Sequence, residues 1–412
     1  MISSFFSARQ FGFLPRSNTT TAALHAISRI QRLLDEQDFT AAVFIDVAKA
    51  FDSVDHDILV RKLELIGIQG RALFLMKSYL NERNQVIKYE QLSSEAGIIQ
   101  NGIPQGSCLS SLLFLIYVND CLHLDLHGYL QMYADDAILI CSDKDPTRLH
   151  TVIQTDLETL DEWLYNNSLS FNAQKTKYMM FKTRGRAYPS LSPIIINGTQ
   201  IQETTCIKYL GLMIDDKLSW KQHIDYVKKI TSPFLGMIKR TTHLIPVETR
   251  LSIYYAYVHS HLTYLISVWG YAGSTWLKQI QIVQNKAIRR IFWNDYKAPG
   301  VHTDDLFKKY SILNVQQLIE YDSSMIIFKL KHNYIKHNFQ LPTFNDTHRY
   351  ETRGRNNYIQ PRCRINITLY SLFSQGIRQF NQLPPQMRSQ ENLKVFKKQL
   401  KTYLISRTRA MT

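Results

Sequence analysis

The segment YLQMYADDAILIC (residues 129–141) decides the fold that the sequence predicts. It contains two short apolar runs, at 129–133 and 137–141, and between them a tip that holds Asp135 and Asp136. Apolar runs of this length around a short polar tip are typical of a β-hairpin. The segment therefore predicts two antiparallel strands with a pair of acids where they turn.

A further strand and two helices are expected on either side of this hairpin. The apolar run AAVFI at 41–45 ends in Asp46, as expected of a buried strand that presents a carboxylate at its end. Residues 52–67 have the apolar spacing of a helix, and a second helix is expected from Asp145-Pro146, with the aspartate as its N-cap. Strands and helices in alternation predict an α+β fold with a mostly antiparallel sheet.

The second part of the chain has a different pattern. Asn197-Gly198 predicts a tight hairpin turn between short strands in residues 194–214. Residues 220–295 are expected to be mainly helical, with Arg and Lys interleaved among Tyr and Trp. Residues 301–412 mix Arg, Asn, Gln and Pro, and their pattern predicts no particular fold.

Charge divides the chain in a similar way. Residues 1–183 carry 16 basic and 21 acidic side chains, whereas residues 184–412 carry 33 and 13. A strongly basic region usually indicates a polyanionic partner, and nucleic acid is the default candidate. A solvated basic surface would have the same composition, so charge alone leaves both interpretations open.

No feature of the sequence predicts secretion or a membrane span. The longest apolar run, 109–118, contains two serines and is too short to cross a bilayer, and residues 1–13 lack the apolar core of a signal peptide. The five cysteines are scattered and form no Cys-x-x-Cys pair, which argues against disulfides and a zinc site. We therefore expect an intracellular protein, in the nucleus or cytoplasm, without membrane contact.

The acids suggest a metal site. Asp46 and Asp135 are 89 residues apart in sequence, but two neighbouring strands of one sheet would bring them together. Converging carboxylates bind hard cations, and two magnesium ions about 3.5–4 Å apart can activate an attacking hydroxyl and stabilise a leaving pyrophosphate. An Asp-Asp pair taken alone is more often an ordinary turn. The residues around the acids decide between these interpretations.

Five segments around the acids occur in a characteristic order. They are FIDVAKAFDSVDH (44–56), NGIPQGSCLSSLLFLIYVND (101–120), YADD (133–136), SLSFNAQKTKYM (168–179) and KYLGLMID (208–215). Together they resemble the palm motifs of reverse transcriptases. With QFGFLP from Gln10 and VHSHLTYLISVWG at 258–270, the chain is similar to non-LTR (LINE-type) retrotransposon polymerases of the jockey kind. The resemblance is strong over residues 8–215 and weaker to about 300.

The resemblance implies catalytic roles for several residues. Asp46 and Asp135 match the metal-binding aspartates, and Asp136 matches the third acid of that site. Neighbouring strand residues face opposite ways, so Asp135 is preferred to Asp136 as a direct ligand. Phe51 matches the aromatic gate under the incoming sugar, and Asp52 is expected to cap the helix that follows.

The resemblance also implies substrate contacts. One motif is expected to lie along the nucleotide and template, and another, the primer grip, at the junction of palm and thumb. They are Pro104, Gln105 and Gly106, and Tyr209, Leu210 and Gly211, respectively. Lys175 matches the lysine that protonates the leaving pyrophosphate, although a solvated surface lysine would look the same in sequence.

The chain also departs from the family pattern. Such proteins usually carry an endonuclease domain and a fingers segment with an Arg-Pro-Ile motif before QFGF, and a zinc knuckle downstream. Here nine residues precede Gln10, so the fingers are expected to be incomplete and the reading frame to be 5′-truncated. Phe5, Phe6, Phe11 and Phe13 would then lack packing partners.

The sequence thus predicts an α+β polymerase right hand. Its expected parts are a palm with partial fingers over 1–215, a helical thumb-like region over 216–300 and a basic region over 301–412. The expected function is RNA-directed DNA polymerase, using two Mg²⁺ ions, an RNA template, a DNA primer and deoxynucleoside triphosphates, with no obligate protein partner. Phe51 disfavours a viral RNA-dependent RNA polymerase, and the motif wording disfavours a group II intron maturase. The alternative is a catalytically dead nucleic-acid-binding remnant.

Overall fold

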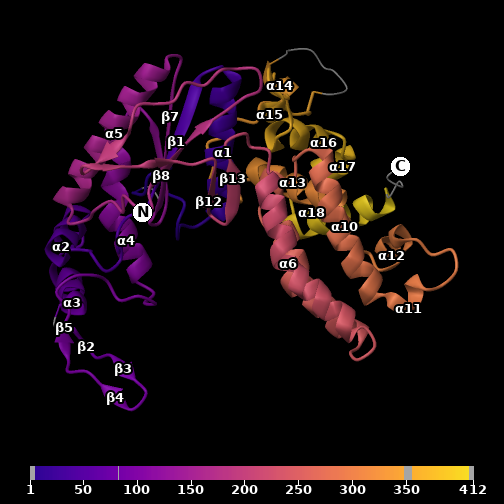
Figure 1. The fold of residues 1–412 in the computed structure, drawn as a ribbon, viewed down its shortest axis with the longest axis horizontal. Coiled ribbons are helices and arrows are strands. Elements are labelled where there is room, and N and C mark those ends of the chain that lie inside the picture. The colour runs from indigo at the N-terminus through magenta and orange to yellow at the C-terminus, as the bar shows by residue number, and fades with distance from the viewer. Residues whose placement is uncertain (1–4, 82, 348–354, 408–412) are drawn as a thin grey trace. The chain divides into compact units, whose positions relative to one another are not determined.

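The computed structural model describes residues 5–81, 83–347 and 355–407. The chain forms two compact units, drawn in Figure 1. Unit 1 consists of residues 1–22 and 36–205, and unit 2 of residues 23–35 and 206–412. The predicted divisions at residues 215 and 300 stay predictions, because compactness alone does not define a functional domain.

Unit 1 is built on a five-stranded sheet with the order β11-β8-β1-β7-β6. All neighbouring strands pair antiparallel except β8 and β11. The pairing confirms the predicted α+β fold with a mostly antiparallel sheet. The strands are β1 (Phe39–Ile45), β6 (Tyr129–Tyr133), β7 (Asp136–Asp143), β8 (Lys177–Phe181) and β11 (Gln202–Glu203).

The β6–β7 hairpin confirms the prediction made from residues 129–141. Tyr133 pairs with Asp136, which leaves Ala134 and Asp135 as a two-residue turn. Ala134 has a φ of +57°, the left-handed conformation that tight hairpin turns require. Asp135 therefore sits in the turn itself, whereas Asp136 is the first residue of β7.

Helices pack on the sheet and form the core of unit 1. Side chains alternate along a strand, so Ala41, Val43 and Ile45 of β1 all enter one apolar cluster. That cluster also contains Leu59 and Phe114 from helices of the same unit. The helices are α2 (His56–Leu65), α3 (Gly70–Leu80), α4 (Ser110–Val118) and α5 (Pro146–Asn166), and a 3₁₀ turn, Asn119–His123, follows α4.

The helix starts test two capping predictions. Asp145 caps α5 as predicted, because its side chain accepts a hydrogen bond from Thr147 N at 2.9 Å. The prediction that Asp52 caps the next helix is wrong, since α2 begins later and Asp55 is its N-cap. Asp52 lies in a turn in which its backbone nitrogen donates to Lys49 O, whereas the Asp55 side chain accepts a hydrogen bond from Ile58 N at 2.9 Å.

The N-terminal phenylalanines also differ from expectation. Phe6 and Phe11 are 5% and 1% exposed and lie in the core, so the prediction that they lack partners is wrong. The reason is a backbone hydrogen bond from Phe11 N to Met132 O, which draws this segment onto β6. Phe5 and Phe13 are 36% and 59% exposed.

Small β-ribbons complete unit 1. Asn197-Gly198 forms the turn between β9 and β10 with φ values of +49° and +71°, which confirms the predicted hairpin. Two exposed ribbons extend from the helices of unit 1, as Figure 1 shows. The strands are β2 (Asn84–Gln85), β3 (Lys88–Tyr89), β4 (Leu92–Ser93), β5 (Gly97–Ile98), β9 (Ile195–Ile196) and β10 (Thr199–Gln200).

Unit 2 is mainly helical, which confirms the prediction for residues 220–295. Its one ribbon in the described residues consists of β12 (Cys206–Tyr209) and β13 (Leu212–Asp215). Trp269, Tyr254 and Phe328 are among its fully buried side chains. The helices up to residue 296 are α1 (Thr19–Asp35, shared with unit 1), α6 (Lys221–Thr241), α7 (Val247–Ile253), α8 (Ser260–Thr263), α9 (Ile266–Trp269), α10 (Ser274–Ile291) and α11 (Trp293–Tyr296), with a π-helical segment at Tyr254–His259.

The region for which the sequence predicted no fold is also helical. Helix α13 (Val315–Lys331) is its longest element and packs against α18 (Leu393–Ser406). The other helices are α12 (Thr303–Lys309), α14 (Phe344–Thr347), α15 (Asn366–Leu369), α16 (Ile377–Asn381) and α17 (Pro385–Arg388), with a π-helical segment at Leu372–Gly376. Within the described parts of the chain, no helix combines the length and apolar character that a bilayer crossing needs.

A buried histidine makes unit 2 sensitive to acid. The Nδ1 atom of His223 accepts a hydrogen bond from Met213 N at 3.3 Å, and burial lowers the pKa of His223 to about 4 from an ordinary value of 6.5. As the pH falls below 6.5, the unfolded chain binds this proton before the folded chain does. Stability should therefore fall by up to about 1.4 kcal/mol per pH unit until the pH reaches the folded pKa.

The measurement is chemical unfolding of wild type and His223→Gln between pH 7 and pH 4. Glutamine keeps an acceptor but does not titrate, so we expect the variant to lose less stability over this range. His25 remains in the variant, and burial with the charge of His337 lowers the pKa of His25 to about 4, so a smaller acid loss should persist. Identical pH profiles would contradict the assignment to His223.

Candidate functional site

The acids predicted to act together lie at one end of two neighbouring strands of the sheet in unit 1. Strand β1 pairs with β7 up to Ile45 and Ala137, so the next step of the register sets Asp46 opposite Asp136. Asp135 precedes Asp136 in the hairpin turn. The structure therefore brings the three acids to the same end of two neighbouring strands.

The three carboxylates influence one another electrostatically. Part of the Asp136 side chain is exposed, yet desolvation by the surrounding protein raises its pKa. The negative charges of Asp135 and then Asp46 raise it further. A carboxylate held near like charges becomes more stable when a cation binds, because the cation offsets both the repulsion and the lost hydration.

The donor set suits a hard divalent cation. Carboxylate oxygens are the ligands that Mg²⁺ prefers, and three carboxylate groups lie at the same end of these strands. Among the residues that the structure describes, no three His, Cys, Asp or Glu side chains are close enough together to hold an ion. The chemistry of Asp46, Asp135 and Asp136 therefore fits a divalent ion, while the described structure shows no formed ligand cage.

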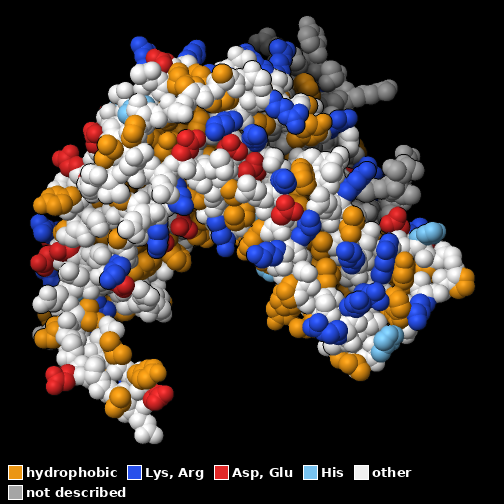
Figure 2. All heavy atoms as spheres, viewed as in Figure 1, with side chains coloured by type: hydrophobic (Ala, Val, Ile, Leu, Met, Phe, Trp, Pro, Cys, Tyr) orange, Lys and Arg blue, Asp and Glu red, His pale blue; other side chains and the backbone are white. Residues whose placement is uncertain are grey.

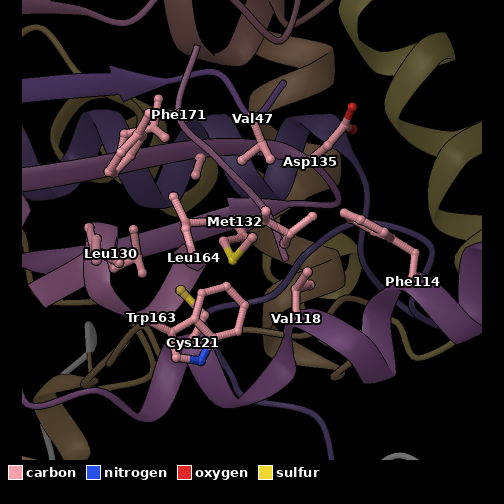
Figure 3. Close-up of a pocket in the computed structure, with 14 residues that line it drawn as sticks. Val47, Phe114, Val118, Cys121, Leu130, Met132, Asp135, Trp163, Leu164 and Phe171 are labelled. Atoms are coloured by element: carbon pink, nitrogen blue, oxygen red, sulfur yellow. The ribbon is translucent and has the colours of Figure 1, made fainter. Parts of the chain in front are cut away.

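A small apolar cavity lies behind the acids. Its volume is about 20 Å³, which is room for roughly one water molecule. Figure 3 shows the Asp135 carboxylate at its rim, pointing away from Met132, Cys121 and Trp163. The cavity is too small to hold a nucleotide. It is a gap in the packing beneath the hairpin, and any substrate must approach the acids from their open side.

Lys175 lies beside Asp46. The segment that carries it is fixed to the end of β1, because Asn172 N donates to Asp46 O at 2.8 Å and Asp46 N donates to Thr176 Oγ1 at 3.3 Å. The Lys175 Nζ atom is 3.7 Å from Asp46 Oδ2, and its side chain is 71% exposed. An ion pair this exposed contributes little stability, so the ammonium group is free to serve another role.

Phe51 is fixed in place by contacts within unit 1. Its ring stacks on Phe114 of α4 with centroids 4.4 Å apart and planes at 18°. Its carbonyl accepts a hydrogen bond from Ile103 N at 3.0 Å. The ring is only partly buried, so it combines a rigid orientation with an accessible surface. A sugar-contacting group would need both properties.

The loop that carries Pro104, Gln105 and Gly106 packs along the segment after Phe51. Gln105 Nε2 donates to Asp52 Oδ1 at 3.0 Å, so the carboxylate expected to cap a helix orients Gln105 instead. The hydroxyl of Ser110 donates to Pro104 O at the start of α4. The structure thus joins two of the motifs that the sequence identified separately.

Two residues that sequence reasoning missed hold the same loop. Gly102 O accepts hydrogen bonds from the Arg83 guanidinium at 2.5 Å and from His56 Nε2 at 2.8 Å, in the histidine tautomer that carries that proton. Gly102 N donates to Val54 O at 2.7 Å. No spacing in the sequence relates Arg83 to this loop, so only a structure could identify the contact.

The predicted primer grip belongs to unit 2. Tyr209 ends β12, and Leu210 and Gly211 form the turn to β13 with φ values of +46° and +82°. The Tyr264 hydroxyl donates to Leu210 O at 2.9 Å. A Cβ at Gly211 would lie 2.8 Å from the Tyr264 ring, so glycine permits this contact. Tyr264 itself falls in the predicted segment 258–270.

The family follows from a comparison with known proteins. Residues 1–214 match the family model described as "Reverse transcriptase (RNA-dependent DNA polymerase)". This match covers just over half of the chain and includes all the site residues identified above. The chain belongs to the reverse transcriptase family. The resemblance to reverse transcriptases that the sequence indicated is therefore confirmed.

Relatives of the chain come from non-LTR elements. The "Probable RNA-directed DNA polymerase from transposon BS" of Drosophila melanogaster is 27% identical over 308 residues, which cover 72% of this chain and 34% of that protein. The "RNA-directed DNA polymerase from mobile element jockey" of the same species is 27% identical over 295 residues, covering 68% and 31%. The chain spans about a third of the length of these curated relatives.

A solved structure also matches the chain. The apo telomerase of Candida tropicalis is 12% identical and has a TM-score of 0.39. The match covers 78% of this chain and 55% of that chain. The predicted likeness to polymerases of the jockey kind is confirmed by the relatives rather than by this structure.

Proposed function

We propose that this chain is the polymerase part of an RNA-directed DNA polymerase from a non-LTR retrotransposon. It would extend a DNA primer on an RNA template with deoxynucleoside triphosphates. The proposal rests on the position of Asp46, Asp135 and Asp136 at the same end of β1 and β7. The Lys175 Nζ atom lies 3.7 Å from Asp46 Oδ2 beside them. The test is Mg²⁺-dependent extension of oligo(dT) on poly(rA), which a catalytically dead remnant would not perform.

The proposed chemistry needs divalent ions, which the family generally uses. Asp46, Asp135 and Asp136 would hold two Mg²⁺ ions, which supply Lewis acidity at the reacting phosphate when bound. The primer 3′-hydroxyl gives up its proton to solvent water, and its oxygen forms a bond to the α-phosphorus as the bond to pyrophosphate breaks. Lys175 would give its proton to the leaving pyrophosphate, and its exposed position beside Asp46 supports this role.

Nucleic-acid binding has support from the charge distribution. All of the basic surplus falls in residues 184–412, because residues 1–183 carry more acidic than basic side chains. Figure 2 shows Lys and Arg side chains gathered over α6 and α10 of unit 2. Arg290 lies over the Trp293 ring at 4.6 Å, and Arg289 over Tyr296 at 5.3 Å. Such stacked guanidinium groups suit phosphate contacts, because stacking fixes their planes and leaves N–H groups at their edges.

Phe51→Ala is expected to increase ribonucleotide incorporation relative to deoxynucleotide incorporation. A ring held rigidly by Phe114 would collide with a 2′-hydroxyl, and loss of a contact of this size is worth about 1–3 kcal/mol, or roughly 10–200-fold in selectivity. The measurement is the ratio of kcat/KM for the two nucleotides. Phe51→Tyr, which keeps the ring, should retain discrimination. An unchanged ratio in Phe51→Ala would remove Phe51 from this role.

Lys175→Ala is expected to lower kcat by about 10²–10⁴-fold, the usual contribution of a positioned general acid. The change should leave stability intact, because the lysine side chain is largely exposed. Lys144→Ala removes another exposed lysine of unit 1 and serves as the matched control. Single-turnover kinetics should show the loss in the chemical step. Equal rates for Lys175→Ala and Lys144→Ala would show that Lys175 is only a surface residue.

A further inference from the structure

The QFGF motif has no role in the proposed chemistry, yet it adjoins the hairpin that carries Asp135. Gln10 forms a parallel bridge with Met132 of β6. Phe11 N donates to Met132 O at 2.9 Å, and Met132 N donates to Arg9 O at 3.0 Å. Since β6 is the last strand of the sheet order, residues 9–11 add a short parallel strand at its edge.

The Gln10 side chain reaches the turn itself. It is 0% exposed, and its Oε1 atom accepts hydrogen bonds from Gly12 N at 2.9 Å and Ala134 N at 3.0 Å. Ala134 immediately precedes Asp135 and has a φ of +57°. A left-handed conformation costs a residue with a Cβ about 1–2 kcal/mol, so the contacts around the turn must maintain it.

Gly12 makes the hydrogen bond between Gln10 and Ala134 possible. A Cβ at residue 12 would lie 2.3 Å from Ala134 N, which is closer than real Cβ contacts allow. Any side chain there would push the motif away from the turn or shift the turn. Gln10 and Gly12 therefore act together: the glycine allows the approach, and the glutamine makes the hydrogen bond.

We propose that Gln10 is a positioning residue, which fixes the backbone of the Ala134–Asp135 turn so that the Asp135 carboxylate stays directed to the cation site. The inference rests on the proposed function, since it assigns that site to Asp135. Gln10 does not itself touch a reacting atom. Groups that orient a metal ligand in this way typically change metal affinity or activity by about 10–100-fold when they are removed.

The test compares Gln10→Met with Gln131→Met in the full chain. Both glutamines are 0% exposed, and Gln131 lies in β6, but its Nε2 donates to Ala22 O rather than to the turn. Methionine has a similar length and no acceptor carbonyl. We expect Gln10→Met to lower kcat by about 10–100-fold, with KM and primer–template affinity unchanged. Gln131→Met should keep the wild-type kcat.

Two measurements do not depend on activity. Mn²⁺ affinity by titration calorimetry should fall in Gln10→Met by the same about 10–100-fold and stay at the wild-type value in Gln131→Met. Hydrogen exchange at the Ala134 amide should be faster only in Gln10→Met. Equal Mn²⁺ affinity in all three proteins, or an equal loss in both variants, would overturn the proposal. If wild type binds Mn²⁺ but extends no primer, the proposed function fails, whereas the Mn²⁺ affinities of the two variants still test the positioning role of Gln10.

Discussion

Asp46→Asn is expected to abolish Mg²⁺-dependent primer extension. Asparagine has the same shape but lacks the charge that would hold a cation. Removal of a single group that stabilises charge in a transition state commonly costs about 10²–10³-fold in kcat, and we expect at least this loss. The fold should survive, because the backbone N and O atoms of Asp46 bond to Thr176 and Asn172, and its side-chain ion pair with Lys175 is exposed to solvent and contributes little stability.

The control for this variant is Asp120→Asn. Asp120 is also partly exposed, with 54% of its side chain accessible, and it pairs with Lys62 at 2.9 Å in the same unit. The Asp120→Asn variant should retain wild-type extension, because Asp120 is not one of the three acids at the ends of β1 and β7. If wild type itself extends no primer while binding nucleic acid, the alternative of an inactive remnant gains support. If Asp46→Asn extends primers as wild type does, the catalytic edge has been assigned wrongly.

Local patterns explain which parts of the fold could be predicted. The β6–β7 hairpin and β1 are short apolar runs next to turn residues, and such runs indicate strands without information from the rest of the chain. The three acids could be assigned to one end of these strands for the same reason, since Asp46 follows β1, Asp135 lies in the turn after β6 and Asp136 begins β7. Asp52 was misassigned because several acids precede α2, and only the hydrogen bond from Ile58 N to the Asp55 side chain shows which of them caps the helix.

Other parts depend on contacts that no local pattern records. Arg83 reaches Gly102 O, and Gln10 reaches Ala134, across 19 and 124 residues of sequence. The helices of residues 301–412 include several of only four residues, such as α15 and α17. A single turn is too short to show the apolar periodicity of a helix, so their sequences resemble loops.

Gly102→Ala is expected to destabilise unit 1 and weaken the site at once. Gly102 has a φ of +86°, and a Cβ there would lie 2.8 Å from Asp52 O and 2.9 Å from Asp52 Cα. Backbone atoms cannot move aside as a flexible side chain can. The left-handed conformation alone would cost alanine about 1–2 kcal/mol. Disturbed hydrogen bonds to Val54, His56 and Arg83 should raise the total to about 4–5 kcal/mol, at roughly 1 kcal/mol for each bond weakened.

Gly67→Ala separates the cost of the left-handed backbone from the cost of the collision with Asp52. Gly67 has a similar φ of +93°, but no atom lies within 4 Å of the position that its Cβ would take. It should therefore show only the conformational cost of about 1–2 kcal/mol. Urea unfolding, with hydrogen exchange in α2 and α4 to report on unit 1, gives the two free energies. Only Gly102→Ala should also slow primer extension, because the shifted loop carries Gln105 away from Asp52. Equal stability losses in the two variants would show that the close approach of Gly102 to Asp52 is unimportant.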